Sequence, residues 1–245
     1  MTEAATASTP APAKPQRWGL GDVALGWLAV QVLAQLWALA VIAGSGRIDD
    51  DFDDLPLTVI ALAQLGLAVG FFAVPYLVTR AKGNGLVADL GLRARWEDAW
   101  RGGIPGVLAQ VVALPLLYWP LLEILDKSVR DLEGPARSLS DRADGAAGVV
   151  LLVLIVGVLA PIFEELFYRG LVQRALLKRG MPPALAIGLT ALVFGATHFQ
   201  LLQLPGLVLA GALFGVLAYR SGRLGPAIAA HVTFNMVTVV ALLAG

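Results

Sequence analysis

The stretch VVLLVLIVGVLA, Val149 to Ala160, is followed directly by PIFEELFYRG, Pro161 to Gly170. The first stretch has no polar side chain, and with its neighbours it approaches the length of about 20 apolar residues that a helix needs to cross a bilayer. The second places two adjacent glutamates and an arginine on the same helix. Each such charge costs about 2.5 to 3.5 kcal/mol at mid-membrane on insertion scales. The two stretches therefore predict a membrane helix that carries charge for a functional reason.

The rest of the chain has the same membrane character. Of its 245 residues, 58% are hydrophobic and only 15% are charged, which is far from the balance of a soluble domain. Hydrocarbon admits only helices or closed barrels, and the apolar runs are too long and too little alternating for barrel strands. We therefore predict an all-α fold, a polytopic helical membrane bundle of about seven transmembrane helices. The predicted spans are Val23–Ala43, Leu57–Thr79, Gly102–Leu125, Gly145–Phe163, Ala184–Thr197, Leu204–Tyr219 and Pro226–Ala244.

The polar residues divide the chain into three predicted parts. Residues 1–21 are rich in Ala, Pro and Thr and lack an apolar core, so they predict a disordered tail and not a cleaved signal. Residues 22–145 predict an amino-terminal three-helix scaffold. Its membrane spans carry few polar groups, and the main exceptions are Gln31, Gln35, Gln64 and Gln110. Residues 146–245 predict a carboxyl-terminal four-helix catalytic core that contains both histidines of the protein.

The basic residues predict the orientation in the membrane. If the spans alternate sides, most lysines and arginines fall on the side of the amino terminus. The positive-inside rule then predicts a multi-pass protein of the cell membrane with a cytoplasmic amino terminus and a carboxyl terminus outside. The tail would be cytoplasmic, and the Ala-, Leu- and Gly-rich composition favours a bacterial source.

Charge and cysteine content exclude several classes of function. The formal net charge is zero, so no basic surface indicates a nucleic acid as partner. There are no cysteines, which excludes a thiol nucleophile, thiolate metal ligands and disulfides. Between the third and fourth spans, DKSVRDLEGPARSLSDRADG is the only long polar segment. We expect it to cover the outer face or to include a short surface helix.

The two neighbouring glutamates differ in their helical neighbours. Glu165 and Arg169 are four residues apart, share a helix face and can neutralise each other as an ion pair. Glu164 has no such partner, since the residue four positions on is Tyr168. Glu164 is therefore the residue available for chemistry.

Two further helices offer polar pairs at the same spacing. FGATH runs from Phe194 to His198 and HVTFN from His231 to Asn235. In each segment the end residues are four apart and share a helix face, so the imidazole of His231 and the carboxamide of Asn235 can face one cavity. A single membrane histidine is often only a packing group. Both histidines beside a charged helix favour a shared functional site.

The positions of these residues across the membrane can be compared by counting residues from the turns that connect the helices. A hairpin at GMPP, Gly180 to Pro183, places Glu164 and His198 at equal distances of about 24 Å from the turn. His231 lies only six residues after Gly225. Either the SGRLGP turn lies deeper than the GMPP turn, or the fourth helix projects beyond the membrane as LVQRALLKR; the basic residues of that segment favour the second arrangement.

The three motifs EELFYR, FGATH and HVTFN, in this order on successive membrane helices, resemble the CPBP intramembrane protease family. That family includes the CAAX prenyl endopeptidases and the bacterial abortive-infection and bacteriocin-immunity proteins. The resemblance covers roughly Gly148 to Asn235, and the first 145 residues show no family signal. The matching residues are Glu164, Glu165, Arg169, Phe194, His198, His231 and Asn235.

The resemblance implies an intramembrane endopeptidase acting on a peptide or membrane-protein substrate within the lipid bilayer. Glu164 would be the general base and later the proton donor, and Asn235 would bond the developing oxyanion. His198 and His231 would position the water or bind a metal. Structural support of the site would come from three further residues: Glu165, Arg169 and Phe194.

A metal and two other functions remain open at this point. Glu164, His198 and His231 could complete a zinc site with one open position, but they lack the HExxH spacing, so a metal-free site without any cofactor is equally compatible. A proton-coupled transporter would spread its polar groups along a path across the membrane, whereas these collect in one half of the chain. A non-catalytic immunity or scaffold protein of the same fold would keep every motif residue.

Overall fold

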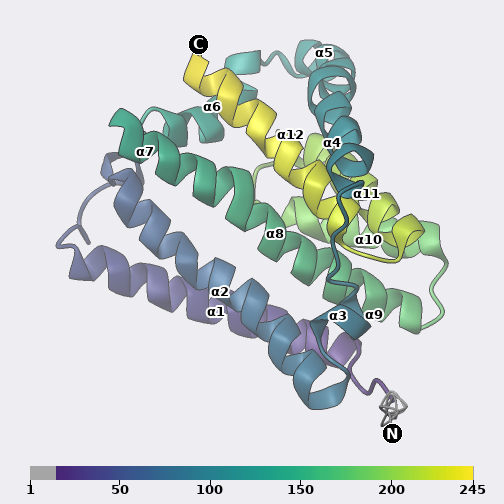
Figure 1. Cartoon of the computed structure of the whole chain (residues 1–245). Helices are drawn as coiled ribbons and strands as arrows, with labels where there is room; N and C mark the ends of the chain where they lie inside the picture. Colours follow the sequence, from purple (N-terminus) through teal and green to yellow (C-terminus); the bar gives the residue numbers. More distant parts are fainter. Residues whose placement is uncertain (1–14, 245) are drawn as a thin grey trace, which may run out of the picture.

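The computed structural model describes residues 15–244, and every regular element within them is helical (Figure 1). Six helices in these residues are long and apolar enough to cross a membrane. They span Leu20–Gly44, Leu57–Lys82, Asp98–Leu125, Gly145–Lys178, Leu204–Ser221 and Gly225–Ala244. The predicted polytopic helical bundle is thereby confirmed. The fifth predicted span is a shorter apolar helix, α10 (Pro183–Ala196).

The first two helices, α1 (Leu20–Gly44) and α2 (Leu57–Lys82), form a hairpin along one side of the bundle (Figure 1). Gly66 and Gly70 of α2 face the side chains of Trp37 and Val30 on α1, and neither glycine has room for a larger side chain. This contact is the close helix packing that small residues four apart permit.

The segment after α2 returns as α3 (Leu86–Leu90) and then as a helix made of α4 (Asp98–Leu108), a π-helical segment η2 (Ala109–Ala113) and α5 (Leu114–Leu125). α4 packs closely across α12 (Gly225–Ala244), as Figure 1 shows. A methyl group built at Gly102 or Gly106 would collide with the backbone of α12, at the carbonyl oxygens of Pro226 and Ala230. This small-residue pair brings the two backbones together.

The fourth long helix is continuous from Gly145 to Lys178 but contains two wide turns. Its parts are α7 (Gly145–Leu152), the π-helical segment η3 (Val153–Leu159), α8 (Ala160–Glu165), the π-helical segment η4 (Leu166–Val172) and α9 (Gln173–Lys178). Short π-helical segments occur frequently at functional sites. Here they flank the glutamate pair on both sides.

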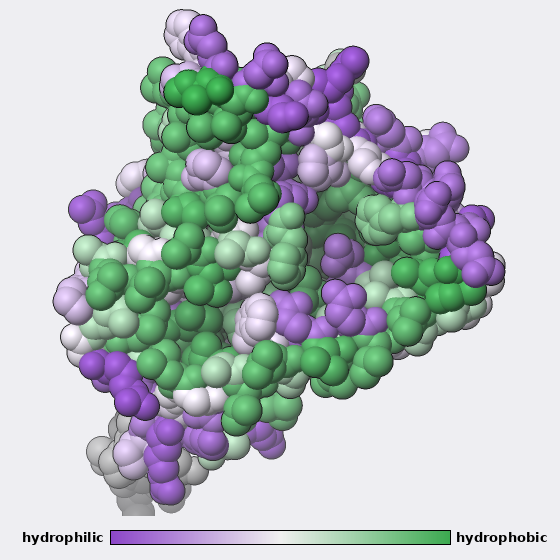
Figure 2. Space-filling view, turned by 180° about the vertical axis from the view of Figure 1, so that it is seen from behind, coloured by the Kyte–Doolittle hydropathy of each residue, from purple (hydrophilic) through white to green (hydrophobic). Residues whose placement is uncertain are grey.

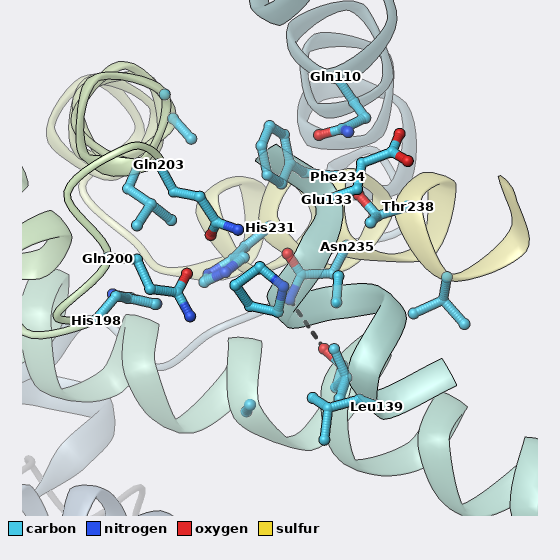
Figure 3. A pocket seen from close by; sticks show the side chains of 18 of the residues that line it. Gln110, Glu133, Leu139, His198, Gln200, Gln203, His231, Phe234, Asn235 and Thr238 are labelled. Atoms are coloured by element: carbon cyan, nitrogen blue, oxygen red, sulfur yellow. Dashed lines mark hydrogen bonds between the residues drawn. The ribbon is translucent and has the colours of Figure 1, made fainter. Parts of the chain in front are cut away.

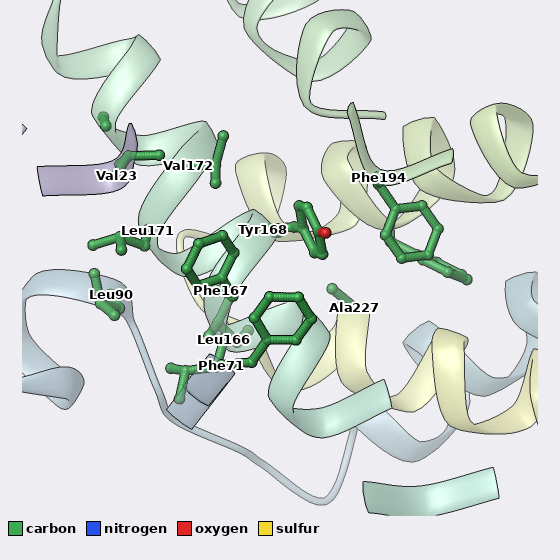
Figure 4. Packing of buried hydrophobic residues seen from close by; sticks show 14 of the residues in the cluster. Val23, Phe71, Leu90, Leu166, Phe167, Tyr168, Leu171, Val172, Phe194 and Ala227 are labelled. Atoms are coloured by element: carbon green, nitrogen blue, oxygen red, sulfur yellow. The ribbon is translucent and has the colours of Figure 1, made fainter. Parts of the chain in front are cut away.

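An aromatic cluster forms the core beneath this helix (Figure 4). The rings of Phe71 and Phe167 have their centroids 4.8 Å apart, and Tyr168 contacts Phe71, Phe167 and Phe194 edge to face. These four side chains are at most 4% exposed. The cluster fixes the rotation of the fourth helix, because Phe167 and Tyr168 lie between Glu165 at the end of α8 and Arg169 in η4.

The predicted disordered tail, residues 1–21, lies only partly within the described residues, and residues 1–14 fall outside them. Trp18 is 2% exposed, and its indole Nε1 donates to Asp89 Oδ2 over 3.1 Å. Lys178 donates to the Trp18 carbonyl oxygen over 2.8 Å and lies 3.7 Å from the centre of its ring. From Pro15 to Gly21 the chain is thus an ordered part of the bundle, because the Trp18 indole bonds the buried Asp89 and the Trp18 backbone bonds Lys178.

The polar segment between α5 and α7 contains a short helix, α6 (Val129–Ser140), as the sequence predicted. Ser128 caps its first turn, accepting a hydrogen bond from the Asp131 backbone N–H while the Asp131 carboxylate accepts from the Ser128 backbone N–H. Gln203, just before α11 (Leu204–Ser221), donates to the Leu132 carbonyl oxygen over 2.8 Å. α6 is therefore tied to the loop that follows α10.

Candidate active site

The register of two antiparallel helices brings the glutamate pair beside His231. Arg174 of α9 donates to the carbonyl oxygen of Gly222, in the turn before α12, over 2.8 Å. Glu165 precedes Arg174 by nine residues, and His231 follows Gly222 by nine. The helix of the glutamates therefore extends past the SGRLGP turn, and this extension accounts for the short interval between Gly225 and His231.

Glu165 and Arg169 form the ion pair that their spacing predicts. Arg169 Nη1 donates to Glu165 Oε1 over 2.8 Å, and both side chains are 0% exposed. Arg169 Nη2 donates to the Gly211 carbonyl oxygen over 2.9 Å. The guanidinium lies over the rings of Phe194 and Phe214, 4.5 and 5.4 Å from their centres. The charge of Arg169 is thus surrounded by a carboxylate, a carbonyl oxygen and two aromatic faces.

The imidazole of His231 lies between the two glutamates. Its Nδ1 is 2.9 Å from Glu165 Oε1 and its Nε2 is 3.7 Å from Glu164 Oε2. Because an ionised carboxylate only accepts hydrogen bonds, the hydrogen-bond network assigns the proton to Nδ1. Phe214 stacks on the ring with a centroid distance of 4.5 Å. Nε2 therefore faces Glu164, and the ring cannot turn without losing both contacts.

His198 is held by its own helix end. Its Nδ1 lies 2.8 Å from the carbonyl oxygen of Phe194, which can only accept, so Nδ1 donates and Nε2 is left as an acceptor. Phe199, the next residue, has a left-handed backbone with φ of +55°. This conformation is uncommon for a residue other than glycine, and it turns the chain sharply after His198, at the end of α10.

Asn235 follows His231 by one helical turn and contacts the wide turn of the fourth helix. Its Nδ2 donates to the Val156 carbonyl oxygen, in η3, over 2.9 Å. That bond fixes the orientation of the carboxamide (Figure 3). One N–H of the amide remains after this contact.

A cavity of about 1360 Å³ unites these groups. Glu164, Phe194, His198, His231 and Asn235 all line it. Figure 2 shows a hollow on one face of the molecule, with hydrophobic walls and polar side chains within it, and Figure 3 shows the polar side chains from inside.

The two glutamates differ in their access to this cavity. The Glu164 side chain is 17% exposed and lines the cavity, whereas Glu165 is fully buried and does not. Glu165 and Arg169 lie buried behind His231, outside the cavity lining. Neither the stacking of Phe214 on His231 nor the bond of Asn235 to the Val156 carbonyl oxygen could be predicted from the sequence, because both contacts depend on the rotation of neighbouring helices.

The arrangement does not fit a metal ion as the donor atoms lie. Among residues 15–244, no three histidine, aspartate or glutamate side chains are grouped closely enough to hold one. Glu164 and His231 face each other across 3.7 Å, and His198 has only its Nε2 open, since its Nδ1 bonds the Phe194 carbonyl oxygen. The three expected zinc ligands, Glu164, His198 and His231, instead line the cavity as polar groups that can hold a water molecule.

Comparison with known proteins gives a family match over part of the chain. Residues 146–237 match the family model described as type II CAAX prenyl endopeptidase Rce1-like. No curated protein and no solved structure matches the chain. All three motifs lie within the matched residues, so the resemblance drawn from them is confirmed for this part of the chain. At the level of the family, the match supports an intramembrane endopeptidase.

Proposed function

We propose that this chain, as a relative of the CAAX prenyl endopeptidases, hydrolyses a peptide bond within the membrane by means of a water molecule that Glu164 activates. One observation supports this most directly. The Glu164 carboxylate faces the Nε2 atom of His231 at 3.7 Å in a cavity that also contains His198 and Asn235. A carboxylate and two imidazoles at one cavity wall are groups that general acid–base catalysis uses.

In the proposed reaction, Glu164 accepts a proton from the bound water as the water oxygen attacks the carbonyl carbon of the substrate. The Nε2 atoms of His198 and His231 are acceptors and hold the second proton of the water, which aligns its lone pair for attack. The distance of 3.7 Å between Glu164 Oε2 and His231 Nε2 is longer than a hydrogen bond. The two groups are therefore free to bond the same water molecule.

The tetrahedral intermediate places negative charge on the former carbonyl oxygen. Asn235 donates its remaining N–H to this oxyanion, while its other N–H stays on the Val156 carbonyl oxygen. Glu164 then gives its proton to the amide nitrogen as the carbon–nitrogen bond breaks. The products are a carboxylic acid and an amine, and Glu164 returns to its starting state.

Glu165 and Arg169 act through His231. The Glu165 carboxylate keeps the proton of His231 on Nδ1, and Arg169 balances the charge of Glu165 in the dry interior. Without Glu165 the ring could adopt the other tautomer, with a proton on Nε2. That proton would point at the water site and remove one acceptor from it.

The experiment that tests this function compares two carboxylates of the same cavity. The purified protein, in detergent and in liposomes, is incubated with a quenched peptide library as wild type, as Glu164→Gln and as Glu123→Gln. Glu123 also lines the cavity but makes no contact with either imidazole. We expect cleavage by the wild type and by Glu123→Gln, and a loss of about 10² to 10⁴-fold for Glu164→Gln, the usual contribution of a general base.

Other outcomes would point to the alternative functions. Equal cleavage by wild type and Glu164→Gln would exclude Glu164 as the base. If no protein cleaves any peptide, in vitro or in cells, the family fold serves a non-catalytic immunity or scaffold role. A proton flux in liposomes that Glu164→Gln abolishes, without cleavage, would indicate a proton-coupled transporter.

The proposed location is the cell membrane, with a cytoplasmic amino terminus and the carboxyl terminus outside. The chain has no cysteine, so a single introduced cysteine is a clean reporter. Asp51→Cys, in the loop between α1 and α2, should react with an impermeant maleimide in intact cells, and Lys82→Cys, at the end of α2, should react only after permeabilisation. The reverse pattern would invert the topology.

A further inference from the structure

Four glutamine side chains from separate parts of the fold line the cavity without any hydrogen-bond partner within residues 15–244. They are Gln31 of α1, Gln64 of α2, Gln110 of η2 and Gln200 of the loop after α10. Three of them belong to the amino-terminal helices, which otherwise have few polar residues. The proposed reaction uses none of them.

Amides without partners are costly in a membrane protein. A buried amide that makes no hydrogen bond costs about 1 to 3 kcal/mol by mutational data. The Oε1 atom of Gln110 is buried and unbonded. Gln173 also has a buried, unbonded Oε1, but its amide nitrogen donates to the Gly215 carbonyl oxygen over 3.0 Å, and Gln203 donates to the Leu132 carbonyl oxygen. The cavity thus gathers four amides that have no partner on either polar atom among the described residues; Gln35, which is exposed on α1, shares that state but does not line the cavity.

The local backbone supports a binding role for two of them. Gln110 is the second residue of η2, and π-helical segments of this kind are common at functional sites. Gln200 follows the left-handed Phe199, so the turn that ends α10 places His198 and Gln200 on the same cavity. Figure 3 shows the Gln110 and Gln200 side chains directed into the space around Asn235.

We propose that these four glutamines form a subsite for the main chain of an extended peptide substrate. This inference rests on the proposed peptidase function. A peptide group has one donor and one acceptor and no charge, and a glutamine amide offers the same combination. A substrate bound in extended form would bring unpaired N–H and C=O groups into the membrane, where each needs a partner. The amides supply those partners on the approach to Glu164.

The test measures substrate affinity with a matched control on the same helix. Gln35 lies one turn after Gln31 but does not line the cavity. Gln31→Met, Gln110→Met and Gln200→Met should each raise KM by about threefold to tenfold, the effect of one lost hydrogen bond. The kcat should stay within about twofold, because the reacting groups are untouched. Gln35→Met should leave both constants unchanged.

A second measurement separates hydrogen bonding from packing. Substrates in which one backbone N–H is replaced by an ester oxygen should bind the wild type about threefold to tenfold less tightly at the position that an amide contacts. The matching Gln→Met variant should show no further loss with that ester. Binding is also measured to each variant in a Glu164→Gln background, where substrate is not consumed.

The outcomes of the two proposals are distinguishable. If the wild type cleaves peptides and the glutamine variants keep its KM and its ester sensitivity, the main-chain subsite is excluded and the peptidase function stands. If the wild type neither cleaves nor binds any peptide, the function itself fails. Variants that unfold early in a thermal melt are replaced by Gln→Asn, which keeps the amide but withdraws it by one methylene.

Discussion

The amino-terminal and carboxyl-terminal helices face one cavity and differ in the chemistry they bring to it. The helices from α7 to α12 contribute charge and imidazoles, in the form of Glu164, Glu165, Arg169 and the two histidines. The helices from α1 to η2 contribute an apolar wall with three uncharged amides. The buried pair of Glu165 and Arg169 lies beneath the cavity surface, where Glu164 is partly exposed. The wall from α1 to η2 has no ion, and the other ions on the cavity are Glu123, Lys127 and Glu133, in α5, α6 and the turn between them.

This difference indicates a division of labour. Ions inside a membrane persist only where partners surround them, and the fourth helix, α11 and α12 together supply those partners for Glu165 and Arg169. An uncharged amide without a partner costs less free energy in a membrane than an unpaired ion does. Such a side chain can therefore remain unbonded until a ligand binds. We therefore expect substitutions in the carboxyl-terminal half to damage folding or kcat, and substitutions on the amino-terminal wall to change KM.

The largest expected effect is at Glu165. Glu165→Gln leaves the buried Arg169 without its counter-ion, and breaking such a pair costs about 3 to 5 kcal/mol of folding free energy. Glu133→Gln breaks the pair with Arg137 in α6, whose side chains are 34% and 40% exposed. An exposed pair four residues apart contributes only about 0.3 to 0.5 kcal/mol. Thermal unfolding in detergent compares the two; equal shifts would refute the buried-pair argument.

Substitution of Asn235 should have the next largest effect, and it should lower kcat without changing KM. Asn235→Leu removes the proposed oxyanion donor, a loss of about 10² to 10³-fold in kcat for a single donor. Thr238→Val, at the next cavity-lining position of α12, should change kcat less than twofold. Steady-state kinetics on a cleaved peptide decide this, and a variant with raised KM but normal kcat would assign Asn235 to binding.

The contact between α4 and α12 joins the two halves and is the next point to test. A methyl group at Gly106 would meet the Ala230 carbonyl oxygen, whereas one at Gly103 would lie 3.4 Å from the nearest atom, on Thr233. Gly106→Ala should therefore cost about 1 to 3 kcal/mol through overpacking and lower activity by displacing His231. Gly103→Ala should be neutral in both measurements. If Gly106→Ala is equally neutral, the close approach is not required.

The smallest expected effect is that of a chelator. The proposed reaction uses only protein groups, so dialysis against EDTA or phenanthroline should leave peptide cleavage unchanged. A loss of activity that Zn²⁺ restores would show that Glu164, His198 and His231 gather around an ion in the working enzyme. The carboxyl-terminal half would then act in catalysis through metal ligands and not through hydrogen bonds to water.

Much of this architecture could be predicted from local patterns. The apolar runs predicted the helical bundle, and the spacing of four residues predicted the ion pair between Glu165 and Arg169. Trp18 was not foreseen as part of the folded bundle, because its partners Asp89 and Lys178 are distant in sequence. The amino-terminal glutamines were noted only as exceptions, since helical position alone does not say which face meets the cavity.

The sequence by itself determined the membrane class, the helical character and the three motifs, because hydropathy and the 3.6-residue period are local properties. Only the tertiary structure decided that Glu165 orients His231 while Glu164 faces the cavity, and that amides from three amino-terminal elements line the same space. Those contacts depend on how far each helix extends past its turn and how it is rotated. Both are set by packing between residues distant in the chain.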